Sequence, residues 1–169
     1  LSTYRSSNRA EFELVRSLVL NHWPDFAKLS KESQEDWVNG NWALYTQAFA
    51  GGAQQPPARQ AGYYFGRALE HELLARVFGP FAKAVPEDPD VHQLTLGPMC
   101  ERLQQPRGRF AKWLDAQKPR LRKELWSIDT HRIVDLRNRS VHPRLHPVTR
   151  TEAEEMAKGC RAFLSLILA

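Results

Sequence analysis

The sequence predicts an all-α fold, a single helical bundle of about five main helices plus short helices. Apolar residues recur at three- and four-residue spacing along most of the chain, as they do on the buried face of a helix. Loops containing proline or glycine separate these periodic segments, and no segment alternates apolar and polar residues as a strand does. With 169 residues, the chain is long enough to bury one hydrophobic core.

Residues 1–57 are predicted to form N-terminal helices that pack on the rest of the bundle. A first helix begins at Asn8, because Glu11 stands three residues later and completes a capping box. A second helix is expected from about Ser33 to Phe49. The glycines and prolines of Gly51–Pro57, GGAQQPP, predict a loop after it.

Residues 58–169 are predicted to form the core of the bundle. Its first helix is expected from about Ala58 to Phe78 and should stop at Gly79-Pro80, since proline disfavours a continuing helix. We interpret one polar face of this helix as solvated, and a place in a functional cleft is the alternative. That face consists of Arg67, Glu70 and His71.

The following segments predict short helices at 94–103 and 108–117, then one long helix from Pro119 to Val141. Apolar residues point in nearly all directions around the long helix, which is typical of a central, buried helix. The last helix is expected to start at Thr151, with Glu154 as its capping-box partner.

The charge of the chain is unevenly distributed. The net charge is +5, but residues 101–150 contain thirteen Lys or Arg and five Asp or Glu, so this block carries +8 and the remainder −3. A basic block on a near-neutral body favours a polyanionic partner, nucleic acid before membrane.

We expect a cytoplasmic protein without a membrane segment. The longest apolar run, Phe163–Leu168, is far too short to cross a bilayer, and the start of the sequence does not resemble a signal peptide. Because the sequence begins with Leu1 rather than methionine, we expect that it could be a domain of a longer protein.

No metal and no cofactor is expected. Cys100 and Cys160 match no metal-ligand spacing and are predicted to be reduced, packed thiols. His142 and His146 are four residues apart, but Pro143 between them disfavours a shared helix face. A phosphate-binding loop, a nucleophile elbow and a dinucleotide-binding turn are all absent from the sequence.

The stretch LRNRSVHPRLHP, residues 136–147, combines an arginine, an asparagine and a histidine at a predicted helix end. Pro143 biases His142 away from helical geometry, so the helix should end there. Arg137 and His142 lie about 140° apart on an ideal helix, whereas Asn138 and His142 share a face. A histidine at a frayed helix end can swing towards a cleft that a long arginine side chain also reaches.

These residue types suit the cleavage of RNA, which carries its own nucleophile in the 2′-hydroxyl. A histidine that titrates near neutral pH can move the proton, and an arginine can stabilise the extra charge on the pentacoordinate phosphorus. The pattern alone is weak, and the alternative is a polar helix end with favourable dipole contacts. In the RNA interpretation, three further arginines hold the bound strand: Arg139, Arg144 and Arg150.

The second half of the chain resembles the HEPN superfamily of helical domains, found in bacterial toxins, phage-defence effectors and RNA-processing factors. The resemblance is carried by the Arg-polar-x-x-x-His motif RNRSVH (137–142), the capped helix after it, LTLGPMCERL (94–103) and ALEHELLARVF (68–78). It covers roughly residues 60–169.

The resemblance implies a metal-independent endoribonuclease that leaves a 2′,3′-cyclic phosphate and a 5′-hydroxyl. It implies that Arg137 and His142 are catalytic, that Asn138 supports them, and that two copies dimerise around a composite cleft. A fused sensor domain or an antitoxin is an implied partner. One toxin subgroup carries a modified tyrosine where this chain has Arg144, so that regulation is not predicted.

Two other functions stay open. The chain could be a catalytically silent HEPN-like module for RNA or nucleotide binding and dimerisation, which predicts tight binding without cleavage. It could also be an unrelated helical protein-interaction domain, which predicts no affinity for nucleic acid.

Overall fold

A computed structural model describes residues 9–49, 56–86, 94–142 and 144–169. Within these ranges the chain is all-α and contains no strand, which confirms the predicted fold class. In chain order the elements are α2 (Arg9–His22), η1 (Pro24–Lys28), α3 (Lys31–Phe49), α4 (Pro56–Leu73), η2 (Leu74–Phe78), α5 (Gly79–Ala84), α6 (Leu96–Gln104), α7 (Arg109–Gln117), α8 (Pro119–Glu124), η4 (Leu125–Ser127), α9 (Thr130–Val141) and α10 (Arg150–Leu168).

The structure does not describe the predicted start of the first helix, and it corrects the predicted end of the loop before α4. Asn8, the predicted start of the first helix, lies outside the described residues, and α2 begins the described chain at Arg9. The predicted loop Gly51–Pro57 extends too far, because Pro56 already belongs to α4. Proline is well suited to the start of a helix, where its missing N–H has no intrahelical partner to lose.

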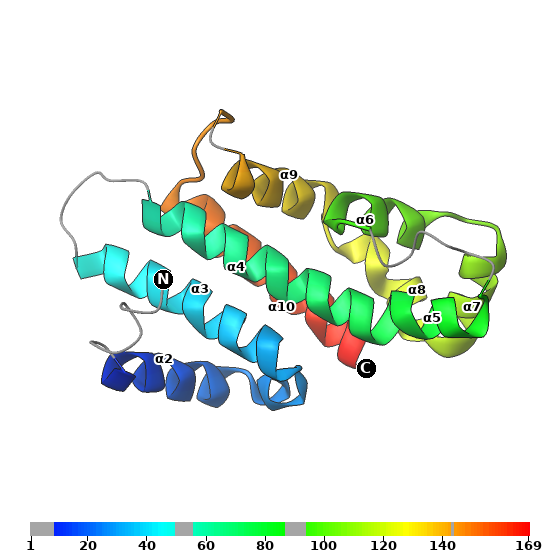
Figure 1. The fold of residues 1–169 in the computed structure, drawn as a ribbon, viewed down its shortest axis with the longest axis horizontal. Helices are drawn as coiled ribbons and strands as arrows, with labels where there is room; N and C mark the ends of the chain where they lie inside the picture. Colours follow the sequence, from blue (N-terminus) through cyan, green and yellow to red (C-terminus); the bar gives the residue numbers. More distant parts are fainter. Residues whose placement is uncertain (1–8, 50–55, 87–93, 143) are drawn as a thin grey trace.

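The central helix of the molecule is α4. It packs against α3, α9 and α10, and Figure 1 shows it running through the middle of the bundle. The predicted apolar stripe of α4 and η2 is confirmed, because its members are fully buried: Phe65, Leu69, Leu73 and Val77. The prediction that residues 119–141 form the central helix is therefore wrong.

Residues 119–141 do not form one long helix either. They divide into α8, the 3₁₀ turn η4 and α9, and Ile128 between them is extended, with φ −107° and ψ 126°. The side chain of Asp129 then accepts a hydrogen bond of 2.9 Å from the backbone N–H of Arg132 and so caps α9. This cap stabilises a new helix start that the apolar pattern did not reveal.

The helix that begins with α4 also does not stop at Gly79-Pro80, as predicted. A π-helical segment, η2, leads into α5, and the N–H of Gly79 donates to the carbonyl oxygen of Leu74, five residues earlier. A Cβ at position 79 would lie only 2.7 Å from that oxygen. The wider turn, which glycine permits, accommodates a proline that an ordinary α-helix would exclude.

The capping box of α10 is formed by Thr149 and Glu152, not by Thr151 and Glu154. The N–H of Glu152 donates to the Thr149 hydroxyl, and the Glu152 carboxylate accepts from the Thr149 N–H at 3.0 Å. Both pairs match the motif, but the buried side chain of Val148 anchors the chain directly before Thr149. The earlier pair therefore starts the helix.

The two cysteines are free and buried, which confirms that they are packed thiols. Burial raises the pKa of Cys100 to about 12 and raises the pKa of Cys160 further, so both are neutral near pH 7. In the part of the chain that the structure describes, no helix combines the length and apolar character needed to cross a membrane.

Candidate functional site

The helix that carries RNRSVH, α9, lies very close to α4. Gly62 faces Ser140 and Gly66 faces Arg137, so the two helices run antiparallel. A Cβ at position 62 would lie 2.1 Å from the Ser140 hydroxyl oxygen, and one at position 66 would lie 2.6 Å from Cγ of Arg137. The helices can approach this closely only because α4 presents glycine at both positions.

Arg137 is held by an ion pair to α4. Its stem passes over Gly66, and its Nη2 atom lies 2.8 Å from Oε1 of Glu70, one turn further along α4. Both side chains are largely buried, with 19% and 14% of their surface exposed. Glu70 also accepts a hydrogen bond of 3.1 Å from the N–H of Leu96, at the start of α6. One carboxylate therefore links α4, α6 and α9.

His142 stands at the end of α9 with its side chain exposed. Its backbone is extended, with φ −98° and ψ 108°, and its N–H still donates to the carbonyl oxygen of Asn138 at 3.0 Å. The sequence predicted this helix end from Pro143, and α9 does end at Val141. The imidazole can therefore reach solvent without any rearrangement of the helix.

Within one chain, the side chains of Arg137 and His142 point to different places. Arg137 is turned towards Glu70 on α4, whereas His142 and Asn138 are both exposed at the end of α9. This agrees with the angle of about 140° that helix geometry gives for residues five apart. The structure therefore brings Asn138 beside His142 but does not join either to Arg137.

Arg59 is a cation at this helix end that the sequence analysis missed. Its Nε atom donates to the carbonyl oxygen of Ser140 at 2.8 Å, one of the last carbonyls of α9, which otherwise have no helical partner. Arg59 begins the face of α4 that continues through Gly62, Gly66 and Glu70, at spacings of three and four residues. In the sequence, a cation, two glycines and an acid at this spacing could have indicated that another helix packs on this face and that Arg59 lies beside its end.

Arg139 is bonded within the chain. Its Nη1 and Nη2 atoms donate to the two oxygens of Glu152 at 2.8 and 2.9 Å, and the guanidinium also donates to the carbonyl oxygens of His146 and Pro147. The hydrogen bonds that Arg139 donates to the Glu152 carboxylate raise the pKa of Arg139. This guanidinium holds residues 146–147 and the start of α10 in place, so little of its donor capacity remains for a phosphate.

The other two predicted RNA-binding arginines are exposed. The Nε atom of Arg150 lies 2.9 Å from Glu154, so this charge is partly compensated, while Arg144 follows the helix end two residues after His142. Among the residues placed by the structure, no group of three His, Cys, Asp or Glu side chains is arranged to hold a metal ion.

Comparisons with protein-family models, with curated proteins and with solved structures find no match to this chain. The fold class is therefore established by the structure alone.

Proposed function

We propose that this chain is a metal-independent endoribonuclease of the HEPN type, acting as a toxin, in phage defence or in RNA processing. The observation that carries the proposal is the exposed imidazole of His142 at the end of α9, one and a half turns after the anchored Arg137. Together with the RNRSVH motif, this arrangement favours a phosphate site over a purely structural helix end.

In the proposed reaction, His142 accepts the proton of the 2′-hydroxyl, whose oxygen attacks the neighbouring phosphorus. The bond from phosphorus to the 5′-oxygen breaks, and this oxygen leaves with a proton from an imidazolium. The products are a 2′,3′-cyclic phosphate and a 5′-hydroxyl. Arg137 donates to the non-bridging oxygens, where negative charge accumulates. Asn138 supports the histidine from the same face.

The ion pair to Glu70 is compatible with this role of Arg137. A guanidinium has five N–H donors, and the ion pair to Glu70 involves Nη2, so other donors remain for a phosphate. Glu70 would then orient the guanidinium, as an anchored donor requires. Because Arg137 and His142 diverge within one chain, we propose that two copies face each other and combine their motifs in one composite cleft.

The test is cleavage of a mixed-sequence RNA in EDTA, followed by mapping of the product ends. Arg137→Ala and His142→Ala should each reduce the cleavage rate at least about 100-fold, as expected when an acid–base group or a charge stabiliser is removed. His131→Ala is the matched control, because His131 is also exposed and also lies on α9, but in its first turn. It should cleave at the wild-type rate.

Equal cleavage by wild type and His142→Ala would refute the proposed mechanism. A requirement for added Mg²⁺, or products that lack the cyclic phosphate, would refute the metal-independent chemistry.

A catalytically silent HEPN-like module for RNA or nucleotide binding and dimerisation is the second candidate. The observation that favours it is the partial burial of Arg137 in its pair with Glu70, which is also what a purely structural arginine would show. This candidate predicts RNA binding that is weakened by Arg137→Ala, with no cleavage by the wild-type protein under any of the conditions above.

A further inference from the structure

The basic block at residues 101–150 separates into two parts in the structure. In the part on and after α9, four of the five arginines are paired with a carboxylate. Arg132 pairs with Glu152 and Glu155, and the other three pairs are Arg137–Glu70, Arg139–Glu152 and Arg150–Glu154. Most of the positive charge near RNRSVH is therefore compensated inside the chain.

Arg144 is exposed beside His142, and a larger group of uncompensated cations lies on and next to α7 and α8. Arg107, Lys112 and Lys123 are exposed, and none of them pairs with a carboxylate of the described ranges. Figure 1 shows α7 and α8 at the opposite end of α9 from the RNRSVH segment. This group of cations, which should attract an anion, is therefore distant from His142.

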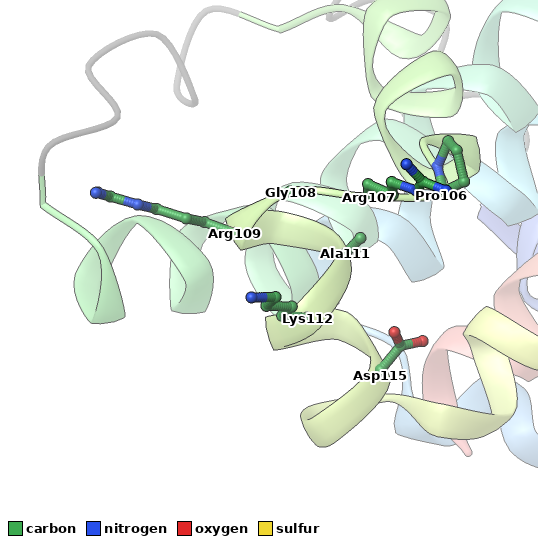
Figure 2. A pocket seen from close by; sticks show the side chains of 7 residues that line it. All are labelled: Pro106, Arg107, Gly108, Arg109, Ala111, Lys112 and Asp115. Atoms are coloured by element: carbon green, nitrogen blue, oxygen red, sulfur yellow. The ribbon is translucent and has the colours of Figure 1, made fainter.

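A hollow of about 500 Å³ lies on this basic surface. Figure 2 shows Arg107 beside Pro106 on one side of it and Asp115 on the other, with Ala111 between them. Arg109 and Lys112 also line it. Asp115, the acid of the hollow, pairs with Arg122 of α8 at 3.3 Å, so this carboxylate does not cancel Arg107 or Lys112.

Trp126 adds a large aromatic surface beside these cations. It is 85% exposed, which is unusual for a tryptophan. It follows the exposed Lys123 by three residues, in the 3₁₀ turn η4 that continues from α8. Two contacts hold this turn at the C-terminal end of α6, which Arg107 follows: Nη1 of Arg122 donates to the carbonyl oxygen of Leu103, and Nε2 of Gln104 donates to the hydroxyl of Thr130. Trp126 therefore lies at the same end of α6 as Arg107.

The backbone that carries Trp126 is ordered by specific contacts. The preceding Leu125 is buried in the core, and its carbonyl oxygen accepts from the N–H of Ile128 at 3.0 Å. The hydroxyl of Ser127 donates to the carbonyl oxygen of Glu124 at 2.7 Å. An indole held in water on a fixed turn is a preformed stacking surface rather than part of a poorly packed core.

We propose that this surface, defined by Arg107, Lys112, Lys123 and Trp126, binds single-stranded nucleic acid. The three cations hold backbone phosphates, and a base stacks on the indole of Trp126, a combination that is typical of proteins that bind single strands. For RNA the inference deepens the proposed function, since the surface would hold a segment of the substrate away from the scissile bond. Binding at this surface nevertheless does not depend on whether the protein cleaves RNA.

Binding is measured by the fluorescence anisotropy of a labelled, short, mixed-sequence oligonucleotide in EDTA, with the full chain carrying His142→Ala so that the probe stays intact. Single-stranded RNA, single-stranded DNA and duplex RNA are compared. Trp126→Ser should weaken binding of single strands about tenfold, as loss of one stacked base does, while Trp126→Phe retains most of the affinity. Duplex RNA should bind more weakly than either single strand.

The cations are tested by the double variant Arg107→Gln/Lys112→Gln. It should weaken binding and lower the slope of log affinity against log salt by about 1.4, since each phosphate contact to a single strand contributes about 0.7. The matched control is Lys31→Gln/Lys158→Gln, which removes the same charge from exposed positions on α3 and α10. It should leave the slope unchanged.

Wild-type affinity in Trp126→Ser, or equal losses in the two double variants, would overturn the proposal. Sedimentation without nucleic acid gives another contradicting outcome. If Trp126→Ser has a lower mass than the wild type, Trp126 is a protein–protein contact and the proposal is wrong. These results are independent of the nuclease test. If cleavage needs His142 but Trp126→Ser binds as wild type does, only the binding surface is refuted. If Trp126→Ser weakens binding but no cleavage depends on His142, only the nuclease mechanism is refuted.

Discussion

At the scale of single residues, Glu70 determines where Arg137 points. Its carboxylate pairs with the guanidinium and accepts the first N–H of α6, both in a largely buried position. Removing one member of such a pair leaves the other charge poorly solvated, which costs more than the pair itself contributes. The orientation of Arg137 and the attachment of α6 are therefore coupled through one side chain.

A double-mutant cycle with Glu70→Gln and Arg137→Gln should reveal this coupling in the free energy of unfolding. We expect an interaction energy of about 1–3 kcal/mol, measured by urea denaturation. The exposed pair Arg120–Glu124, with 63% and 43% of its side-chain surfaces exposed, is the matched control. It should give less than about 0.5 kcal/mol, and equal values for the two cycles would show that burial does not strengthen the Glu70 pair.

The role of Glu70 was only partly accessible from the sequence. The face of Arg67, Glu70 and His71 was interpreted as solvated, and Glu70 instead meets an arginine from another helix. Arg67 likewise pairs with Asp36 of α3, at 2.8 Å. Helical spacing identifies which residues share a face, but it contains no information about which distant element covers that face. RNRSVH itself was recognisable because its residues are local.

At the scale of elements, the contact between α4 and α9 depends on small residues. Gly62 and Gly66 are four apart, which places them on one face of α4, and they receive Ser140 and Arg137. The depth of this contact determines how far α9 and its C-terminal His142 stand from α4.

Gly62→Ala should destabilise the protein by about 1–3 kcal/mol, because the added methyl group overlaps the Ser140 hydroxyl and must push the helices apart. Thermal unfolding measures the effect. Ser140→Ala in the same chain should restore part of the loss, since Cβ of Ser140 would lie at 3.3 Å from the new methyl group.

Gly97→Ala is the matched control for Gly62→Ala. Its new Cβ meets only Cγ1 of Val134, at an ordinary 3.5 Å, and Gly97 also lies within a helix. Alanine should therefore be neutral there or stabilise by up to about 1 kcal/mol through helix propensity. Equal destabilisation by both substitutions would contradict the close approach of α4 and α9.

The helices with strong local signals were predictable, and their interruptions were not. The short helices expected at 94–103 and 108–117 are observed as Leu96–Gln104 and Arg109–Gln117. The break at Ile128 has no proline or glycine to mark it, and the proline at position 80 is accommodated by a π-helical turn. In both cases tertiary packing and capping decide the outcome, and these interactions do not follow from the apolar period.

At the scale of the whole molecule, charge compensation divides the surface into two regions. The acids of α10 neutralise arginines of α9, whereas the α7–α8 surface keeps free cations. The sequence revealed the basic block but not this division, because the compensating Glu152 and Glu155 lie outside the block. The compensated region also connects α9 to α10 and should therefore respond to acid.

Glu152 should make the stability of the protein depend on pH. Its hydrogen bond from Arg139 lowers its pKa from 4.5 to about 2, so the folded state binds the proton more weakly than the unfolded state does. Stability from this pair is therefore fully present above about pH 4.5 and is lost as the pH falls towards about 2. Glu152→Gln keeps the capping box, because glutamine also fits that position, and it removes the charge together with one of the two oxygens that accept from Arg139. Near neutral pH this variant should be less stable by about 1–2 kcal/mol, and the difference from wild type in urea denaturation should shrink as the solution is acidified.

Glu154→Gln, which removes an exposed pair, should cost less than about 0.5 kcal/mol. A difference between wild type and Glu152→Gln that stays constant down to about pH 2.5 would mean that Glu152 acts through packing rather than through its charge.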